Sequence, residues 1–334
     1  MNREGAIGQM MALTLDDLFA SPDHYLHSFE GDSALFVPMD RAAYGRSIFL
    51  DGRISPASDQ SMHLPAAALA ANPPAPKRTG WIFHVAHCGS TLLARALDDP
   101  ASNLVLREPL ALRQQAFARD PARLALTLAM LSKRYRADLP TIVKANVPVN
   151  FLLPRIAASD PGAAAIFLHC ALRDYLLAIL RSENHRNWLR RVTEQLAAWL
   201  GDLSALSDAE RCAALWLAQS RAFESALAGM ANGRSLDSEA FFAAPGPVLK
   251  AAASHLGVPM DEPAAAATVA GPLFATYSKN PGLPFDNEAR LARRAETEAT
   301  LTAELDEAQA WIDRNGGAEA ASAQAAIADA RLQA

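Results

Sequence analysis

The chain has 334 residues, of which 51% are hydrophobic and 20% charged, and its formal net charge is −5 at pH 7. This apolar fraction excludes a disordered protein and allows a sizeable core, in two domains or in one large α/β unit with additions. The slight acidic excess argues against a general nucleic-acid-binding protein, because no basic surplus is available to neutralise a run of phosphates. Any anion-binding site must therefore be local.

The cysteines and the start of the chain indicate its compartment. Cys88, Cys170 and Cys212 are odd in number and show no paired spacing, which argues against a secreted disulfide scaffold. Polar and acidic residues interrupt the apolar stretch within the first 20 positions, unlike a secretory signal. No apolar run approaches the roughly 20 residues of a membrane helix. We expect a cytoplasmic protein that binds neither membranes nor nucleic acids.

Residues 1–78 are predicted to form an N-terminal accessory segment. A short helix is expected over residues 13–20 with Thr14 as its cap, followed by short strands over 33–37 and 47–50. Prolines then cluster over residues 64–77. Because proline interrupts both helices and sheet ladders, this stretch is the best candidate for a linker.

After the prolines, short apolar stretches alternate with helical ones. The pattern predicts strands over residues 80–86, 103–107, 141–143 and 164–169, and helices over residues 92–98, 110–135, 175–200 and 207–230. Ser207 and Glu210 form a capping-box pattern at the start of the last of these helices. Strands that are apolar on both faces indicate a mostly parallel sheet covered on both sides, and hence a three-layer α/β/α domain over residues 79–315.

The C-terminal part gives a weaker signal. Residues 287–311 are predicted to form one long charged helix. Residues 316–334 are assigned to an alanine-rich tail, which is either a lightly attached helix or a frayed end.

The turn between the strand at 80–86 and the next helix is the first candidate site. Gly89, Ser90 and Thr91 would present backbone N–H groups and hydroxyls at the start of a helix, an arrangement suited to a phosphate or sulfate. A plain glycine turn with a serine cap is the alternative. A nucleotide-hydrolase loop of the form GxxxxGK[ST] would need glycine and lysine where His84 and Ser90 stand, so ATP or GTP hydrolysis is disfavoured.

The stretch from Ala86 to Leu93 (AHCGSTLL) resembles the loop with which the sulfotransferase family holds the 5′-phosphosulfate of 3′-phosphoadenosine-5′-phosphosulfate (PAPS). It departs from the family pattern at His87, where arginine or lysine is usual, and at Cys88. Residues 235–260 and 277–279 also resemble family elements in the same order. The resemblance implies a P-loop NTPase-like fold of a divergent, bacterial-type member. It implies cofactor binding by the loop residues His87, Cys88, Gly89, Ser90, Thr91 and Leu92.

The resemblance also implies catalytic roles for three residues. Glu108 stands where one branch of the family has its base, and Lys144 stands where the family often has a strand-terminal lysine near the transferred group. His87 could donate to the bridging oxygen, although a helix N-terminus disfavours its protonated form. The structural alternatives are a surface pair or helix cap for Glu108, a packed loop histidine, and a strand-end lysine.

The site for the 3′-phosphate departs further from the family pattern. Cys170 and Ala178 stand where the family has arginine and serine. Arg173, Arg181 and Ser182 could form a basic, hydroxylated pocket instead, with a different geometry, because one extra residue rotates a helical side chain by ~100°.

Three other interpretations of these residues remain open. His84, His87, Cys88, His169 and Cys170 could bind zinc, but histidines within apolar strands are more often core residues, and we expect no metal. Cys88 could be reactive if the helix N-terminus lowers its pKa. The arginines over residues 186–191 resemble a nucleic-acid patch, but such a helical face is normally just solvated.

The sequence therefore predicts transfer of a sulfuryl group from PAPS to a hydroxyl or amine acceptor, a small molecule or a peptide. One alternative is a P-loop protein that binds another phosphorylated ligand, such as a small-molecule kinase. The other is a non-catalytic relative that retains the anion loop. The sequence predicts neither the acceptor nor the oligomeric state.

Overall fold

A five-stranded parallel sheet forms the centre of the protein, in a computed structural model that describes residues 13–334. Each strand pairs in parallel with its neighbours. Every residue of the three strands β4, β5 and β6 is buried, as expected for a sheet covered on both faces. In spatial order the strands are β5 (Leu104–Arg107), β6 (Thr141–Lys144), β4 (Thr79–His84), β7 (Ala165–His169) and β8 (Gly233–Asp237).

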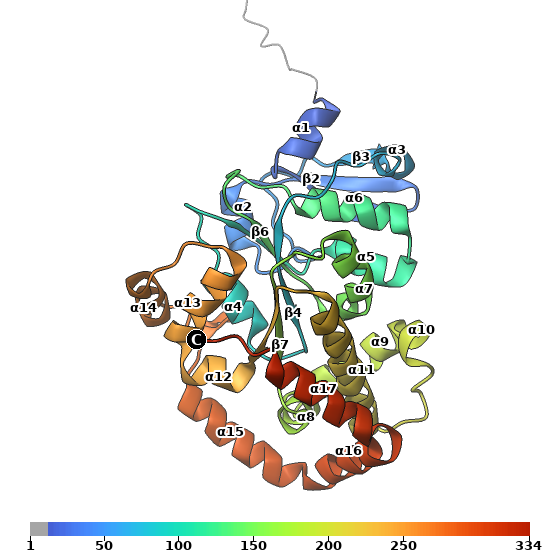
Figure 1. Cartoon of the computed structure of the whole chain (residues 1–334), viewed down its shortest axis with the longest axis vertical. Helices are drawn as coiled ribbons and strands as arrows, with labels where there is room; N and C mark the ends of the chain where they lie inside the picture. The colour runs from blue at the N-terminus through green and yellow to red at the C-terminus, as the bar shows by residue number, and fades with distance from the viewer. Residues whose placement is uncertain (1–12) are drawn as a thin grey trace, which may run out of the picture.

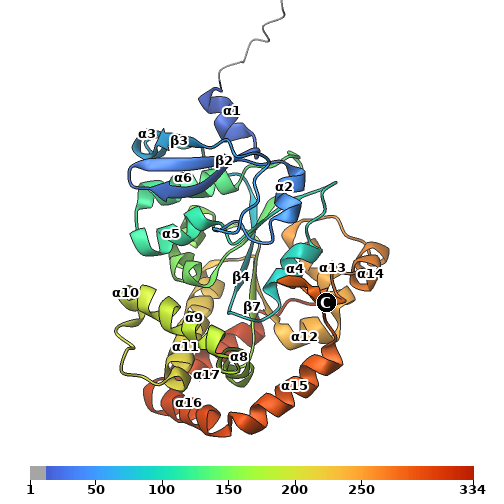
Figure 2. The ribbon, with the colours of Figure 1, turned by 180° about the vertical axis from the view of Figure 1, so that it is seen from behind.

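Helices cover both faces of this sheet. Figure 1 shows the sheet nearly edge-on, with α4, α12 and α13 on one side and α7 and α11 on the other, and Figure 2 shows the same division from behind. The predicted three-layer α/β/α, P-loop NTPase-like fold is confirmed by this parallel sheet and its helical layers. The helical elements of this part are α4 (Ser90–Ala96), α5 (Leu110–Ala118), α6 (Pro121–Leu131), the 3₁₀ turn η1 (Val147–Leu152), α7 (Leu153–Ser159), α8 (Leu172–Leu180), α9 (Glu183–Gln195), α10 (Ala197–Leu200), α11 (Asp208–Gly229), α12 (Ser238–Ala243), α13 (Pro245–Leu256) and α14 (Glu262–Ala270).

Helix starts follow the caps that the sequence indicates. The predicted capping box at α11 is present, with the Glu210 N–H donating to Ser207 Oγ at 3.2 Å and the Ser207 N–H donating to the Glu210 carboxylate at 3.4 Å. Thr14 caps α1 (Leu15–Ala20) in the same way, as predicted. Each cap satisfies N–H groups that have no partner within the helix.

The three longest predicted helices are broken in the structure. Arg119 has φ 54° and Asp120 caps a new helix that begins with Pro121, so residues 110–135 form α5 and α6. Ser182 is extended and caps α9, which divides the predicted helix over residues 175–200. The apolar periodicity continues across such breaks, and the capping residues are the signal that a new helix begins.

The N-terminal segment forms an antiparallel sheet of β1 (His24–Glu30), β2 (Ser33–Pro38) and β3 (Met62–Pro65), with the short helices α2 (Arg41–Arg46) and α3 (Ala66–Ala70). The strand predicted over residues 47–50 is wrong, because the Leu50 N–H donates to the carbonyl of Arg107 and takes no part in a ladder. The third strand lies instead at the start of the proline-rich stretch. Residues 1–12 of the predicted accessory segment lie outside the described residues.

This N-terminal sheet shares a core with the rest of the protein. Leu26, Phe29 and Phe36 from its strands pack in one buried cluster with Ala111 of α5 and Met130 of α6. The prolines over 73–76 lie between α3 and β4 in an irregular, mostly exposed stretch of chain. The proline-rich stretch is therefore a surface loop, and the N-terminal sheet on one side of it packs in the same hydrophobic cluster as α5 and α6 on the other.

The C-terminal part returns to the sheet. It contains the hairpin β9 (Thr276–Tyr277) and β10 (Asn280–Pro284), then α15 (Asn287–Thr300), α16 (Thr302–Asn315) and α17 (Gly317–Asp329). The predicted single helix over residues 287–311 is thus divided at Leu301. The alanine-rich tail is an attached helix, since Ala320, Ala323 and Ile327 of α17 are buried and the Leu332 N–H donates to the Ser235 carbonyl of β8 at 2.8 Å.

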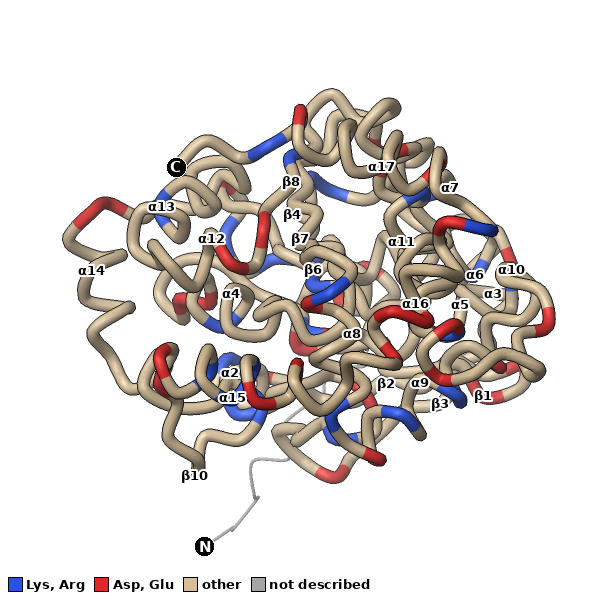
Figure 3. The backbone as a smooth tube through the Cα atoms, turned by 90° about the horizontal axis from the view of Figure 1, so that it is seen from below, with Lys and Arg blue, Asp and Glu red and all other residues tan. Residues whose placement is uncertain are grey.

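Acidic and basic residues are both distributed over the whole described chain. Figure 3 shows Lys and Arg positions interspersed with Asp and Glu around the molecule. Within residues 13–334, no helix combines the length and the apolar character needed to cross a membrane.

A buried lysine fastens the N-terminal segment to the core. Lys133, which follows α6, is only 3% exposed, and its ammonium donates to the carbonyls of Leu18, at 3.1 Å, and His24. Both partners are neutral, so burial dominates and lowers the pKa of Lys133 to about 7. The folded protein therefore releases this proton at a pH where the unfolded chain still holds it.

We predict that Lys133 makes the protein more stable as the pH rises from 7 to 10. In this window the unfolded chain binds up to one proton more than the folded chain, so the free energy of unfolding should rise by at most about 1.4 kcal/mol per pH unit from this group. Urea unfolding at several pH values measures the slope. Lys133→Met should lack the rise and the exposed Lys250→Met should keep it; equal slopes in wild type and Lys133→Met would contradict the prediction.

Candidate functional site

The loop after β4 has the backbone conformation that the sequence suggests. Gly89 has φ +85° and immediately precedes α4. A Cβ at this position would lie 2.9 Å from Cζ of Phe242, so both the conformation and the space require glycine. His87 is also left-handed, with φ 62°. The chain thus makes two unusual turns within three residues, which brings residues 87–92 to the edge of a cavity.

This cavity, of about 510 Å³, lies at the carboxyl ends of β4 and β7. We call it the basic cavity. The loop residues 87–92, one face of α8, the β9–β10 hairpin and α15 line it. All six loop residues predicted to bind the cofactor are among its lining, as is Arg181; these are His87, Cys88, Gly89, Ser90, Thr91, Leu92 and Arg181.

Five basic side chains line the basic cavity, and two of them are neutralised. Arg290 donates from Nη1 and from Nη2 to the Glu239 carboxylate, each at 2.8 Å, and Arg294 pairs with Asp174 and Glu239. The other three basic residues have no carboxylate within ion-pair distance anywhere in the described chain; they are Arg181, Lys279 and Arg293. The cavity therefore carries an uncompensated positive charge.

The loop adds an unused polar group. Thr91 lines the cavity, and its buried hydroxyl has no hydrogen-bond partner among the described residues. A buried hydroxyl without a partner is costly, and an anionic oxygen in the cavity would satisfy it.

Most of this positive charge comes from residues that the sequence analysis did not select. Lys279 lies between the two strands of the hairpin, in the stretch where a family resemblance was noted but no role assigned. Arg290, Arg293 and Arg294 lie on α15, where their spacing of three and four residues places them on one helical face. This spacing was the sequence signal for a basic helical face, but the charged face of a helix is more often simply exposed to solvent.

Two predicted cofactor ligands do not line the cavity. Asp174, Leu177, Ala178 and Arg181 face it at intervals of three and four residues, whereas Arg173 is exposed and pairs with Glu298. Ser182 instead caps α9, its Oγ accepting the His185 N–H at 3.4 Å. The structure therefore places Arg181, and not Arg173 or Ser182, where it can reach a ligand.

His87, in the loop after β4, is a neutral residue in the lining of the basic cavity. Its ring lies 4.1 Å from that of His185 and 6.0 Å from that of Trp188, measured between centroids. Burial, together with the nearby charges of Lys279 and Arg181, holds the pKa of His87 well below its usual value. It can donate a hydrogen bond to a ligand but does not carry a positive charge at neutral pH.

The other two predicted catalytic residues meet at the adjacent strand ends. Lys144 is fully buried, and its ammonium donates to the Glu108 carboxylate and to His84 Nε2 at 3.0 Å. His84 Nδ1 lies 2.8 Å from the Val85 carbonyl, so we assign the proton to Nδ1, which leaves Nε2 as the acceptor. We call these three residues the buried triad.

Charge within the buried triad follows from this geometry. Burial and the Lys144 ammonium lower the pKa of His84 to about 3, so the imidazole is neutral. Burial alone would raise the pKa of Glu108, but Lys144, His84 and Lys279 outweigh it and lower the value to about 2. Glu108 is consequently an ionised and weakly basic carboxylate at neutral pH.

Glu108 and Lys144 do not themselves line the basic cavity, and Lys279 connects the two sites. Lys279 lines the cavity and is close enough to Glu108 and Lys144 for their charges to affect it. Desolvation lowers its pKa, Glu108 raises it and Lys144 lowers it. A ligand beside Lys279 would thus lie next to the buried triad.

The structure places the residues of the other interpretations. Within residues 13–334 no group of three His, Cys, Asp or Glu side chains is placed to hold a metal ion. The Cys88 thiol donates to the Val85 carbonyl at 2.9 Å, and burial raises its pKa to about 11. Burial thus opposes the lowered pKa that a reactive Cys88 would require.

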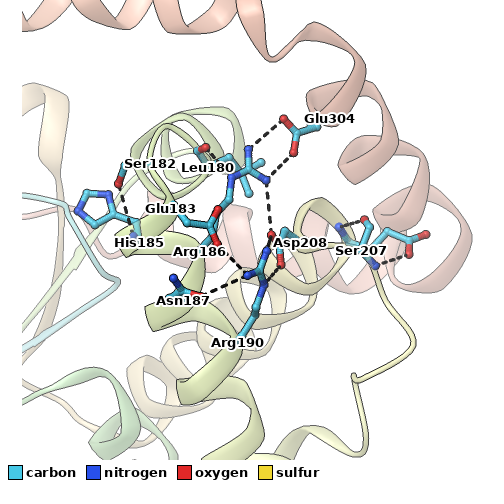
Figure 4. Close-up of polar contacts among 11 residues, drawn as sticks. Leu180, Ser182, Glu183, His185, Arg186, Asn187, Arg190, Ser207, Asp208 and Glu304 are labelled. Atoms are coloured by element: carbon cyan, nitrogen blue, oxygen red, sulfur yellow. Dashed lines mark hydrogen bonds and ion pairs between the residues drawn. The ribbon is translucent and has the colours of Figure 1, made fainter.

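Two of the three arginines of α9, Arg186 and Arg190, are engaged in ion pairs. Figure 4 shows Arg186 joined to Glu304 and Asp208, and Arg190 joined to Asp208 and Glu183. These contacts tie α9 to α11 and α16 and neutralise both guanidinium groups, which leaves them unavailable to phosphates.

Solved structures that are similar to this chain include two sulfotransferases. No family model matches the chain, and no curated protein matches it. A sulfotransferase domain from the curacin biosynthetic pathway aligns with TM-score 0.41 and 15% identity over 59% of this chain and 78% of that one. A sulfotransferase from Alicyclobacillus acidocaldarius aligns with TM-score 0.36 and 14% identity over 73% of this chain and 98% of that one. Both are described as sulfotransferases, the family that the loop sequence resembles.

We predict that the buried triad tolerates loss of both charges better than loss of one. Lys144→Met should lower the free energy of unfolding by roughly 3 kcal/mol, because the Glu108 carboxylate loses its counter-charge. Lys144→Met with Glu108→Gln should recover much of that loss. Urea unfolding at pH 7 measures Lys144→Met, Glu108→Gln and the double variant, with the exposed Lys250→Met as a control. A double variant that is as unstable as the sum of the two single ones would contradict the coupling.

Proposed function

We propose that the protein transfers a sulfuryl group from PAPS to a hydroxyl or amine of a small molecule or peptide. The observation that carries the proposal is the set of three basic side chains, Arg181, Lys279 and Arg293, that line one cavity without carboxylate partners. They come from three separate elements, so they would surround a ligand. A cavity with this charge excess favours a ligand that carries several negative charges.

Apolar and aromatic side chains supply the rest of a nucleotide site. Phe242, Tyr277 and Phe285 line the same cavity, and the Phe285 ring lies 5.9 Å from that of Phe242 and 5.4 Å from that of Tyr277. Aromatic faces are suitable surfaces for stacking a base. The volume of about 510 Å³ lies within the usual range for ligand sites.

The chemistry would take place between the loop and the buried triad. Sulfuryl transfer, like phosphoryl transfer, requires mainly positioning and cationic stabilisation of the peripheral oxygens. Lys279 supplies a charge beside the loop, and neutral His87 supplies a hydrogen bond. As the acceptor oxygen bonds to sulfur, the bond from sulfur to the 5′-phosphate breaks and the acceptor proton passes to Glu108. A weak base suffices if that proton moves late.

The kinase-like alternative has less support from the loop. A nucleotide-hydrolase loop places a lysine next to its hydroxyl residue, and Ser90 occupies that position here. Lys279 reaches the cavity from a different element, the turn between β9 and β10. ATP binding is therefore one of the outcomes that the nucleotide titration below distinguishes.

We predict that adenosine 3′,5′-bisphosphate, the product nucleotide of PAPS, binds in the basic cavity. Isothermal titration should show binding to the wild type, and Arg293→Ala and Lys279→Ala should each weaken it about tenfold, as expected for loss of a charge-assisted hydrogen bond. Arg314→Ala serves as the control, because Arg314 is exposed on α16 and pairs with Glu210; it should leave the affinity within about twofold.

Two results would contradict the proposed function. One is no binding of the bisphosphate at millimolar concentration. The other is ATP binding more tightly than adenosine 3′,5′-bisphosphate, which would favour the kinase-like alternative. If binding is found, transfer from PAPS to a panel of phenols, alcohols and amines tests the reaction itself.

A further inference from the structure

Arg107, the last residue of β5, is a buried arginine that the reaction scheme does not use. It is 2% exposed, and its guanidinium pairs with Asp98. The remaining N–H groups point to the N-terminal segment: Nη2 donates to the carbonyls of Tyr44 and Ser47 at 2.6 and 2.7 Å, and Nε donates to that of Ile48 at 3.1 Å. One planar guanidinium thus holds three carbonyls at the C-terminal end of α2.

The loop that Arg107 holds returns to the same strand end. The Leu50 N–H donates to the Arg107 carbonyl at 2.7 Å, and the Leu50 carbonyl accepts the Leu110 N–H at 3.1 Å. These two backbone hydrogen bonds lie on either side of Glu108 and Pro109. Leu50 of the N-terminal segment therefore holds the backbone at both ends of this two-residue stretch.

Glu108 has a backbone conformation that these contacts can explain. Its φ is +56°, which is costly for a residue with a side chain, and the following Pro109 further restricts it to extended conformations. The Glu108 N–H donates to the Lys144 carbonyl at 2.8 Å. Conformations of this kind persist only where surrounding contacts impose them.

We propose that Arg107 is a positioning residue that holds Glu108 in contact with Lys144 through the N-terminal segment. The guanidinium fixes residues 44–48, Leu50 fixes the chain on both sides of Glu108, and the left-handed turn directs the carboxylate to the Lys144 ammonium. Phe49 of the same loop lies over this centre, its ring centroid 5.8 Å from Lys144 Nζ. The value of this arrangement for catalysis rests on the proposed function, but the placement of Glu108 does not.

Arg107→Lys is the appropriate variant, because it keeps a positive charge beside Asp98 and loses the planar fork. In the wild type, ¹³C NMR of the glutamate side-chain carboxyls should show Glu108 ionised down to the lowest pH at which the fold persists, with its signal assigned by Glu108→Gln. In Arg107→Lys the pKa of Glu108 should rise by about one unit or more, because the carboxylate moves away from Lys144. Hydrogen exchange of the Leu50 and Leu110 amides should accelerate about tenfold or more.

Arg186→Lys is the matched control. Arg186 also joins two elements through a paired carboxylate and a carbonyl, those of Glu304 and Leu180, but it lies at the junction of α9 and α16 (Figure 4). Its replacement should lower stability without changing the pKa of Glu108. A pKa of Glu108 that is the same in Arg107→Lys as in the wild type overturns the proposal, whether or not the Leu50 amide exchanges faster.

Nucleotide titration separates this proposal from the proposed function. Arg107 does not line the basic cavity, so Arg107→Lys should bind adenosine 3′,5′-bisphosphate within about twofold of the wild type. A wild type that binds no nucleotide would remove the proposed function, while the NMR measurement would still decide the role of Arg107.

Discussion

The site depends on the compensation of one fully buried ammonium group. Lys144 ends the second strand of the sheet, and the parallel register places it opposite Arg107 of β5 and Ile82 of β4. The residues at the ends of those neighbouring strands, Glu108 and His84, are therefore the side chains that can reach it. A carboxylate and a neutral imidazole acceptor satisfy the ammonium, and burial makes both contacts obligatory. The same contacts fix the charge of Glu108 and the tautomer of His84.

A second electrostatic constraint acts in the basic cavity. Asp174 and Glu239 neutralise Arg294 and Arg290, which leaves Arg181, Lys279 and Arg293 to repel one another. Burial, together with these positive charges, opposes protonation of His87 and His185 in the cavity and lowers the pKa of both. An anionic ligand would relieve the repulsion and fill the partner position of the Thr91 hydroxyl. An anion that binds in this cavity would therefore stabilise the folded protein.

The sequence predicted those features that depend on local pattern. Apolar strands, the helix caps at Thr14 and Ser207, and the glycine turn at Gly89 each carry their signal within a few residues. The breaks within the long helices and the strand β3 were not predicted. Apolar periodicity alone does not show where a helix restarts or which short stretch pairs with the edge of a sheet. In the site, the loop residues were identified and lie together, whereas Arg293 and Lys279 reach the cavity from more than 180 residues away along the chain. Such a convergence is a property of the packing.

The N-terminal segment shows the same dependence on packing. Its composition and its prolines predict an accessory segment. In the structure its backbone carbonyls are the hydrogen-bond partners of two buried cations. Lys133 and Arg107 both bury cationic side chains against its carbonyls, and each would be left without these partners if the segment were removed. Because the carbonyls that satisfy Arg107 lie directly beside Glu108, the cost of detaching the segment would fall on the buried triad as well as on stability.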